Sequence, residues 1–429
     1  MIPCRLTDTP RSAHRNGDSE ENPKIPGLHA PGRKSALIVS YTDNWENRGV
    51  LYHKWLSAHG HEVRFITSNF NHFTLARRDQ KDLPACGEFI KVPAYRGNLS
   101  ISRGLSYCVF GIRLLSSLFT RKPDLVVATV PCNSTGFAAM LYKRLHPKTI
   151  LVVDVFDLWP ESLPSSVLKK VLSPVTFLWR SCRSTAIASA DLTICECEKF
   201  SQKIKSQQPT SHPQTLYLMG KKSSQSAQDS IEKIPIRIAY LGSINHIIDI
   251  DGMLRLLEAL AAHREVFVEI IGCGVLQTQF LEKLARAGIK HNFHGAVFDQ
   301  TEKDSILSSC HFGLNMMNDQ VFVGLTTKSI DYAGCGLPLL NTISGDTWTL
   351  VEQYGAGFNI TDPCSAADII STMTNESFKK MRHGVSLMYQ DHFSSEALMS
   401  RLGSALGSVV PARQTPPSEG PLNRTELLS

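Results

Sequence analysis

The sequence predicts an α/β fold built from two doubly wound domains. Two observations support this prediction. Short apolar runs of strand length alternate with amphipathic helical patterns, and a polar, Ser- and Lys-rich segment interrupts the alternation near mid-chain. The 429 residues, 42% hydrophobic and 20% charged, suffice for two domains with separate cores. In chain order, the predicted parts are a disordered segment (1–34), an N-terminal domain (35–218), a linker (219–234), a C-terminal domain (235–382), a helical region able to pack back on the N-terminal domain (383–407) and a disordered tail (408–429).

The N-terminal half opens with a strand–helix–strand unit. An apolar run from Ser35 reads SALIVSY, a helical pattern VLYHKWLSAHG stops at Gly60, and HEVRFIT follows as a second strand. Further strand-like runs are KPDLVVATVP, TILVVDVFD and ADLTICECEKF, with helical patterns between them. Such short loops and crossover helices are typical of a parallel sheet.

Two loops of this half hold candidate binding residues, because ligands of open α/β sheets bind at the carboxyl edge of the strands. Asn47, Arg48 and Gly49 open the first helix and could contact a phosphate or an acceptor; a plain polar loop is the alternative. Asp157 and Glu161, in the segment DLWPES after an apolar strand, are the best candidates of this half for contact with a substrate. Their alternative is a helix cap or a turn with solvated acids.

The C-terminal half repeats the alternation of strands and helices. It begins with IRIAYLGSI, whose strand ends at Gly242, and an amphipathic helix DIDGMLRLLEALAAH follows. The sequence Gly272-Cys273-Gly274 after the next strand lacks a third glycine at the required spacing, which disfavours a dinucleotide-binding loop.

The stretch GLTTKSIDYAGCGLPLL predicts a loop, a short helix, a glycine stop and a buried strand. The unpaired N–H groups of the helix start form an anion site, Thr326 or Thr327 is the expected N-cap, and Lys328 adds a positive charge in the first turn. Asp331 follows three residues later on the same face. A nucleotide sugar offers both a phosphate and hydroxyl groups to such a helix; a mixed polar face without a ligand is the alternative. The candidate donor contacts are Gly242, Gly324, Leu325, Thr326, Lys328 and Asp331.

Composition limits the other classes of function. The net charge of +6 permits an anionic partner, but no dense basic stripe interleaved with aromatic residues argues for nucleic acid. The eleven cysteines show neither zinc nor thioredoxin-type spacing, so reduced thiols, no metal and a cytosolic location are expected. The N-terminus lacks the apolar core of a signal peptide, and no run is long and apolar enough to span a bilayer.

Residues 99–122 mix large apolar side chains with Arg103, Arg113, Arg121 and Lys122. A helix with an apolar face and basic flanks can lie on an anionic membrane, which would make the protein peripheral to the inner face of the cell membrane. The alternative is a core-facing helix with solvated arginines.

Three segments carry a resemblance to a known family: DLWPES at 157–162, YLGSI at 240–244, and TKSIDYAGCGLPLL at 327–340 followed by GDTW at 345–348. Their order and spacing resemble glycosyltransferase family 4 (glycosyl transferase group 1), in particular its members that build O-antigen, capsule and exopolysaccharide. The resemblance covers about residues 35–405. It implies the GT-B fold, in which two Rossmann-like domains face a central cleft.

The resemblance also implies a function. The C-terminal domain would hold a nucleotide-sugar donor and the N-terminal domain a lipid-linked or growing glycan acceptor. Family members retain the configuration of the transferred sugar and need no metal, so cationic side chains and helix N-termini would stabilise the departing diphosphate. Lys328 would contact the diphosphate, Asp331 the ribose hydroxyls, and Asp157 or Glu161 the reacting sugar or the acceptor hydroxyl.

The chain departs from the family pattern at three positions. Val323 stands where the family has the first of two acids, and Ser243 and Ile248 stand at the usual basic positions, with His246 between them. Two alternative functions stay open: a GT-B sugar-nucleotide 2-epimerase, because that enzyme class shares the fold, and a non-catalytic sugar-nucleotide-binding partner in a polysaccharide assembly complex, which the missing basic residues favour.

Overall fold

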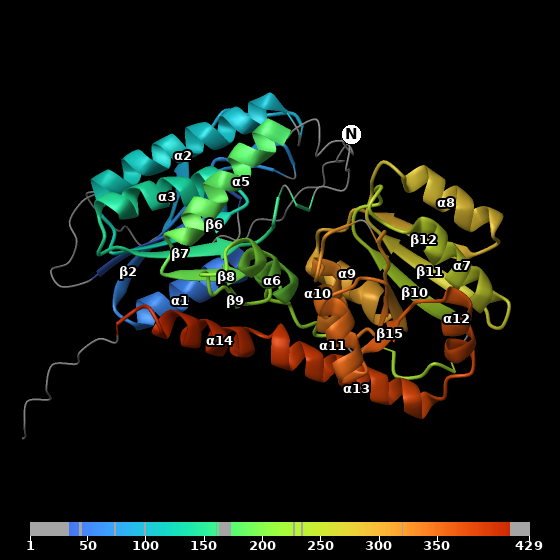
Figure 1. Cartoon of the computed structure of the whole chain (residues 1–429). Helices are drawn as coiled ribbons and strands as arrows, with labels where there is room; N and C mark the ends of the chain where they lie inside the picture. Colours follow the sequence, from blue (N-terminus) through green and yellow to red (C-terminus); the bar gives the residue numbers. More distant parts are fainter. Residues whose placement is uncertain are drawn as a thin grey trace, which may run out of the picture.

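Two parallel sheets, each covered by helices, make up the molecule (Figure 1). The structure, a computed structural model, describes residues 34–42, 45–72, 74–97, 100–159, 161–162, 173–225, 228–232, 235–319 and 321–411. The predicted disordered segments lie outside these ranges, except for residue 34, which begins the first strand, and residues 408–411. The linker predicted at 219–234 is described apart from residues 226, 227, 233 and 234.

The N-terminal sheet has the order β5-β2-β1-β6-β7-β8-β9. Its strands are β1 (Lys34–Ser40), β2 (His61–Ser68), β5 (Gly87–Ile90), β6 (Leu125–Val130), β7 (Ile150–Val155), β8 (Leu192–Cys195) and β9 (Gln214–Thr215). All of its strand pairs are parallel. In β6 every residue is buried, which explains why this strand is a continuous apolar run in the sequence.

The C-terminal sheet has the order β12-β11-β10-β13-β14-β15. Its strands are β10 (Ile236–Leu241), β11 (Val266–Ile271), β12 (Lys290–Gly295), β13 (Phe312–Asn315), β14 (Leu339–Asn341) and β15 (Gly357–Asn359). In both sheets the order of successive strands therefore reverses beside the first strand, between β1 and β6 and between β10 and β13. This is the doubly wound arrangement expected from the sequence, and such a switch point places ligands at the carboxyl ends of the strands.

Helices cover both faces of each sheet. The N-terminal domain has a turn at Trp45–Gly49 and the helices α1 (Val50–Ala58), α2 (Ile101–Arg121), α3 (Asn133–Leu145), α5 (Ser173–Ala188) and α6 (Glu198–Gln207). The rest of the chain has α7 (Ile250–Ala261), α8 (Gln277–Arg286), α9 (Gln300–Ser308), α10 (Thr327–Gly334), α11 (Asp346–Tyr354), α12 (Pro363–Ser371), α13 (Asn375–His392) and α14 (Ser395–Gly407). Helices α2, α3 and α5 lie together on one face of the N-terminal sheet, and α1 lies on the other (Figure 1).

No helix or strand was predicted for the segment between β2 and β5. It holds the short hairpin β3 (Phe70–Asn71) and β4 (Ala76–Arg77) and a single 3-10 turn, Gln80–Asp82. Two-residue strands are too short to show an alternating pattern, so periodicity could not reveal them.

The chain crosses between the domains twice, and the two crossings touch. The first runs from β9 into the linker, and the second runs from α13 to α14, which packs on α1 of the N-terminal domain. Gly220 N–H donates to the carbonyl of Phe393 (2.9 Å), and the Tyr389 hydroxyl donates to the carbonyl of Gly220 (3.1 Å). A buried apolar cluster runs from the N-terminal core into α10, α11 and α13, so the domains share part of their core.

Candidate functional site

Helix α10, predicted as the centre of the binding site, is anchored by Tyr332. The hydroxyl of this buried side chain accepts a hydrogen bond from the backbone N–H of Leu241 (2.8 Å) at the end of β10. Its ring leaves no space for a side chain at Gly313 in β13, where a Cβ atom would lie 2.6 Å from the ring. These contacts hold α10 against β10 and β13, the two strands at the switch point of the C-terminal sheet.

Thr326 is the N-cap of α10. Its hydroxyl accepts from the backbone N–H of Ser329 (3.3 Å) and donates to the side-chain carbonyl of Asn315 (3.0 Å), a buried residue at the end of β13. Asn315 donates in turn to Ser329 Oγ and to Asn341 Oδ1, both at 2.9 Å. This polar network ties the cap to the sheet and explains why Thr326 rather than Thr327 takes the position.

Lys328 lies half-buried in the first turn of α10. Its ammonium group sits 5.0 Å from the centre of the Tyr240 ring, at the carboxyl end of β10 and near Gly242. Gly242 has φ +122°, a conformation that L residues rarely adopt. None of the ion pairs among the described residues involves Lys328, and burial lowers its pKa to about 8. The side chain is therefore a cation that a bound anion would stabilise.

Asp331, predicted to lie on the same face as Lys328, has a different neighbour. Lys303 of α9 donates to its Oδ1 at 3.1 Å. Burial raises the pKa of Asp331, and the Lys303 ammonium lowers it. The carboxylate is partly exposed at 30%, so a ligand hydroxyl could still reach it beside Lys303. Its contact with ribose stays a prediction.

In the N-terminal domain the two predicted acids have unlike surroundings. Burial raises the pKa of Asp157, and the hydroxyl of Ser162 partly offsets this effect. Glu161 forms a two-pronged ion pair with the buried Arg183, with N–O distances of 2.9 and 2.8 Å, and a further ion pair with Arg180. Hydrogen bonds from Arg183 hold the pKa of Glu161 down at about 2, against the effect of burial. The arginine ion pairs thus hold Glu161 in place, whereas none of the ion pairs among the described residues involves Asp157.

The three residues predicted at the start of the first helix are buried or have partners within the protein. Arg48 is fully buried, with Nη1 2.7 Å from Asp154 Oδ1 and its guanidinium 4.2 Å from the centre of the Phe156 ring. Asn47 exchanges hydrogen bonds with the backbone of Met219 at the domain crossing (3.1 and 3.4 Å), and Gly49 is buried. Both side chains have protein partners, which does not support direct contact with an acceptor; that contact stays a prediction.

Glu196, which follows β8, is a further titratable group at the carboxyl edge of the N-terminal sheet. Burial raises its pKa to about 8, with Arg48 lowering it and the carboxylates of Asp157, Asp154 and Asp346 raising it further. A protonated Glu196 at neutral pH could donate a hydrogen bond, whereas Asp157 nearby could accept one.

The domains meet where α6 begins, at a contact that the sequence did not reveal. Cys197 gives α6 no side-chain cap. Instead Asp346, at the start of α11 in the other domain, accepts from the backbone N–H groups of Glu198 (2.6 Å) and Lys199 (3.0 Å). The Tyr217 hydroxyl donates to the same carboxylate (3.1 Å). A carboxylate at a helix N-terminus is favourable, so Asp346 stabilises the contact between the domains.

We expect Asp346→Ala to lower the free energy of unfolding by about 2–3 kcal/mol, because two N–H groups and a buried hydroxyl lose their acceptor. Asp362→Ala, which removes a cap within the C-terminal domain (Ser365 N–H to Oδ2, 2.8 Å), is the control and should cost about 1 kcal/mol. Chemical denaturation and small-angle X-ray scattering provide the measurements. An increase in radius of gyration is expected for Asp346→Ala alone; equal radii would contradict an interdomain role.

The positions that depart from the family pattern supply no charge in the structure either. Ile248 is buried in the core of the C-terminal domain, and the Ser243 carbonyl accepts from the Tyr240 hydroxyl (2.8 Å). His246 is exposed. Val323 contributes its backbone carbonyl, which accepts from Lys199 Nζ of the N-terminal domain (3.1 Å).

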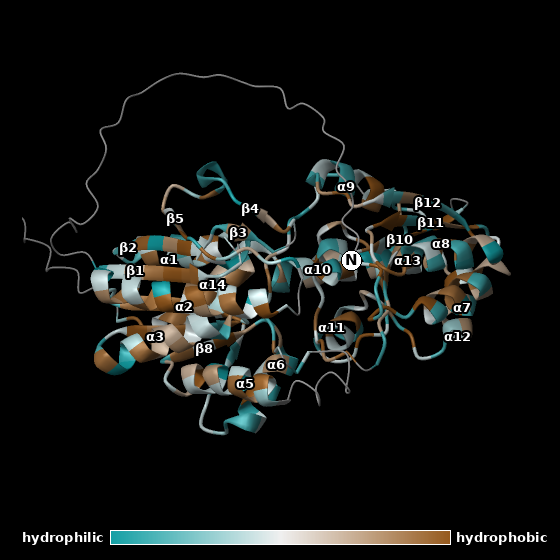
Figure 2. Ribbon diagram, turned by 90° about the horizontal axis from the view of Figure 1, so that it is seen from above, coloured by the Kyte–Doolittle hydropathy of each residue, from teal (hydrophilic) through white to brown (hydrophobic). Residues whose placement is uncertain are grey.

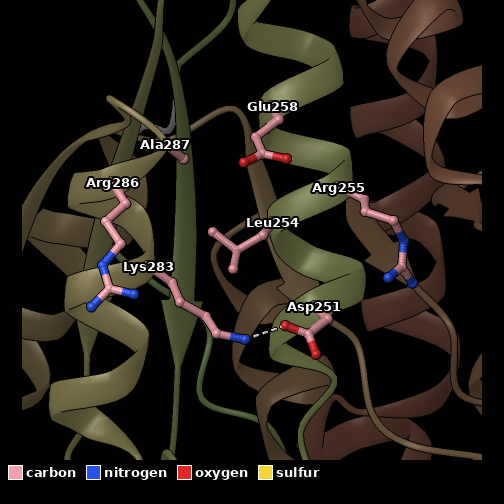
Figure 3. Close-up of a pocket in the computed structure, with 7 residues that line it drawn as sticks. All are labelled: Asp251, Leu254, Arg255, Glu258, Lys283, Arg286 and Ala287. Atoms are coloured by element: carbon pink, nitrogen blue, oxygen red, sulfur yellow. Dashed lines mark hydrogen bonds and ion pairs between the residues drawn. The ribbon is translucent and has the colours of Figure 1, made fainter.

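A pocket of about 440 Å³ lies elsewhere, between α7 and α8 (Figure 3). It is lined by Asp251, Leu254, Arg255, Glu258, Lys283, Arg286 and Ala287. Lys283 pairs with Asp251 across it, and none of the predicted site residues borders it. Across the part of the chain that the structure describes, no group of three or more His, Cys, Asp or Glu side chains could hold a metal ion.

The fold is that of GT-B glycosyltransferases, as comparison with solved structures shows. HepE (Alr3699) of Anabaena, crystallised with UDP and glucose, matches with a TM-score of 0.60 and 14% identity, over 87% of this chain and 99% of that one. The lipopolysaccharide outer core galactosyltransferase WaaB matches with a TM-score of 0.59 and 12% identity, over 88% and 100%. The predicted α/β, GT-B fold is therefore confirmed.

A second kind of enzyme has the same fold. A UDP-N-acetylglucosamine 2-epimerase matches with a TM-score of 0.56 and 13% identity, over 90% of this chain and 98% of that one. No protein-family model matches the chain, and no curated protein sequence matches it significantly. At these identities the likeness establishes the fold alone.

Proposed function

We propose that the protein is a glycosyltransferase that moves a sugar from a nucleoside diphosphate to an acceptor held by the N-terminal domain. One observation carries the proposal. Lys328 is a half-buried cation without an ion-pair partner among the described residues, in the first turn of a helix that starts at the switch point of the C-terminal sheet. A diphosphate there would meet both the ammonium group and the N-terminal N–H groups of α10.

The roles of the residues follow from their surroundings. Lys328 and the loop Gly324–Thr326 would bind the diphosphate, Gly242 would let the backbone approach it closely, and Asp331 would accept from the ribose. Asp157 would face the reacting sugar or the acceptor hydroxyl, because the ion pairs found in this segment among the described residues engage Glu161 and not Asp157. Glu161 would act through Arg183 by fixing the loop that carries Asp157.

The resemblance at 157–162 and 327–340 supports finer proposals: membership of family 4, retention of configuration, no metal requirement, and a lipid-linked or growing glycan acceptor in bacterial surface polysaccharide synthesis. Turnover of UDP- and GDP-sugars with lipid-linked acceptors, with and without EDTA, tests them together. Inactivity with every donor–acceptor pair would contradict the transferase proposal, and loss of activity in EDTA would contradict only the metal independence.

The second candidate is a sugar-nucleotide 2-epimerase, which the similarity to such an enzyme supports. An epimerase needs no acceptor. Incubation with UDP-N-acetylglucosamine alone, followed by product analysis, separates the two: an epimer or a free sugar favours the epimerase, whereas unchanged donor and acceptor-dependent release of UDP favour the transferase. Donor binding without any turnover would instead favour a non-catalytic partner.

We also propose that one face of the N-terminal domain contacts an anionic membrane. Helices α2, α3 and α5 contain seven Lys or Arg residues and no Asp or Glu; one of the seven, Arg183, is buried in its ion pair with Glu161. Among the described residues, nine of the fifteen exposed large hydrophobic side chains lie on these helices: Ile101, Leu105, Ile112, Phe119, Phe137, Leu145, Val175, Phe177 and Leu178. Apolar residues recur along all three helices (Figure 2). In the described part of the chain, no helix is long and apolar enough to cross a bilayer.

Along α2 the exposed residues Ile101, Leu105, Cys108 and Ile112 recur at helical spacing opposite the buried face, so this helix has two apolar sides. We expect Leu105→Ser with Ile112→Ser to reduce binding to vesicles with 30% anionic lipid at least about fivefold, because about 0.8 kcal/mol is lost per CH₂ group removed from the interface. Val275→Ser with Phe298→Ser, on exposed apolar residues of the C-terminal domain, is the control. Equal sedimentation of all three proteins with vesicles would contradict this surface.

A further inference from the structure

The start of α6 is inserted between two glycine loops of the C-terminal domain. A Cβ atom at Gly324 would lie 2.9 Å from Lys199 Cβ and 2.4 Å from Asp346 Oδ2, and one at Gly345 would lie 3.2 Å from Lys199 Cδ. These loops precede α10 and α11. Only glycines allow the N-terminal domain to approach the start of α10 this closely.

The Lys199 side chain crosses from one domain to the other. Its Nζ donates to the Val323 carbonyl (3.1 Å) and to Ser344 Oγ (3.2 Å), and it lies 5.2 Å from the centre of the Phe322 ring. Both hydrogen-bond acceptors are neutral. Asp346, the nearest carboxylate to the Lys199 backbone, is occupied by the N–H groups of α6 and by Tyr217. The ammonium group therefore keeps its charge and has one of its three N–H donors left for a ligand.

Two further facts point to an anionic ligand. Lys199 is half-buried, and burial lowers its pKa more than Cys197 and the Asp346 carboxylate raise it, so the loss of water around its charge is not fully compensated. The family's usual cationic positions are held by Ser243 and Ile248, so the C-terminal domain offers Lys328 alone in the first turn of α10.

We infer that Lys199 of the N-terminal domain binds the diphosphate of the nucleotide sugar when the domains are closed, and so replaces the cations that the C-terminal domain lacks. The inference rests on the proposed function, since it names a further residue of the same site. It follows that the C-terminal domain alone provides only part of the diphosphate site, and that domain closure and diphosphate binding stabilise each other.

The test is calorimetric titration of the full chain with two series of ligands. One series is uridine, UMP and UDP, and the other is guanosine, GMP and GDP. Lys199→Met should weaken binding of the diphosphate at least about tenfold and leave binding of the nucleoside within twofold, because only the phosphates meet the ammonium group. Lys199→Arg should retain most of the affinity. Lys205→Met, an exposed lysine on the same helix, is the control and should bind like wild type.

Each outcome is decisive. Equal weakening of nucleoside and diphosphate would assign Lys199 to domain closure alone and overturn the inference, as would unchanged diphosphate binding in Lys199→Met. In both cases the proposed function would stand, because wild type binds the diphosphate. If wild type binds neither UDP nor GDP, the proposed donor site fails and the inference fails with it. Circular dichroism and thermal unfolding confirm that each variant is folded.

Discussion

Replacing Lys328 with Met is expected to lower kcat/KM for the nucleotide-sugar donor by about 10²–10³. A cation aimed at the leaving diphosphate acts where charge develops, and removing one such group costs catalysis about this much. The half-buried ammonium lies over the Tyr240 ring with no carboxylate of the described residues in ion-pair distance, so its charge is available to the ligand. Steady-state kinetics give the measurement, and Lys380→Met, an exposed lysine of α13, is the control.

The same residue predicts a pH dependence. Burial lowers the pKa of Lys328 to about 8, so the free enzyme carries this charge below pH 8 and loses it above. Donor affinity and kcat/KM should therefore fall as the pH rises through 8, by up to tenfold per unit. Lys328→Arg stays charged and should abolish this fall. A wild-type profile that is flat from pH 7 to 9, or an unchanged fall in Lys328→Arg, would contradict the assignment.

The largest loss of stability is expected for Asp154→Asn. Asp154 is fully buried and accepts from Arg48 Nη1 (2.7 Å) and from the Tyr52 hydroxyl (2.9 Å). Without it Arg48 stays buried with no counter-charge, and breaking such a pair costs about 3–5 kcal/mol. Two other nitrogens of Arg48, Nε and Nη2, already lack a hydrogen-bond partner within the described residues.

The companion variant Arg48→Leu with Asp154→Leu removes both charges and should recover most of the loss, because a buried pair often contributes little net stability. Glu282→Gln, which breaks an exposed ion pair with Arg286, should cost at most about 0.5 kcal/mol. Urea denaturation compares the three. A double variant as unstable as Asp154→Asn would show that packing, not the uncompensated charge, dominates.

The fold could be predicted well from the sequence because buried parallel strands appear there as continuous apolar runs. The strand β6 and the helix α7 can be predicted from their own residues. Both faces of β6 are buried, which gives a continuous apolar run, and one face of α7 is buried, which gives an amphipathic pattern. The N-cap of α10, expected at Thr326 or Thr327, was an equally local signal. The short strands of the separate hairpin β3–β4 show no such apolar pattern in the sequence.

Contacts between distant residues could not be predicted in this way. Asp346 and Lys199 are 147 positions apart, and Arg48 and Asp154 are 106 apart; only the folded arrangement brings them together. Arg48 was therefore predicted to contact a phosphate, although its partner in the structure is the buried Asp154. One signal did exist for Lys199: it follows the carboxyl end of β8, the edge at which ligands of such sheets bind.

The two touching chain crossings have a mechanical consequence. Because Gly220 and Phe393 are joined by a hydrogen bond, the two connections between the domains act as a single pivot rather than as two separated supports. Rotation about one pivot moves nearby residues little and distant ones most. Met219 is next to Gly220, so opening about this pivot would leave its contact with Asn47 almost in place, whereas the contact between Lys199 and Val323 joins the domains outside the chain crossings and would be free to separate.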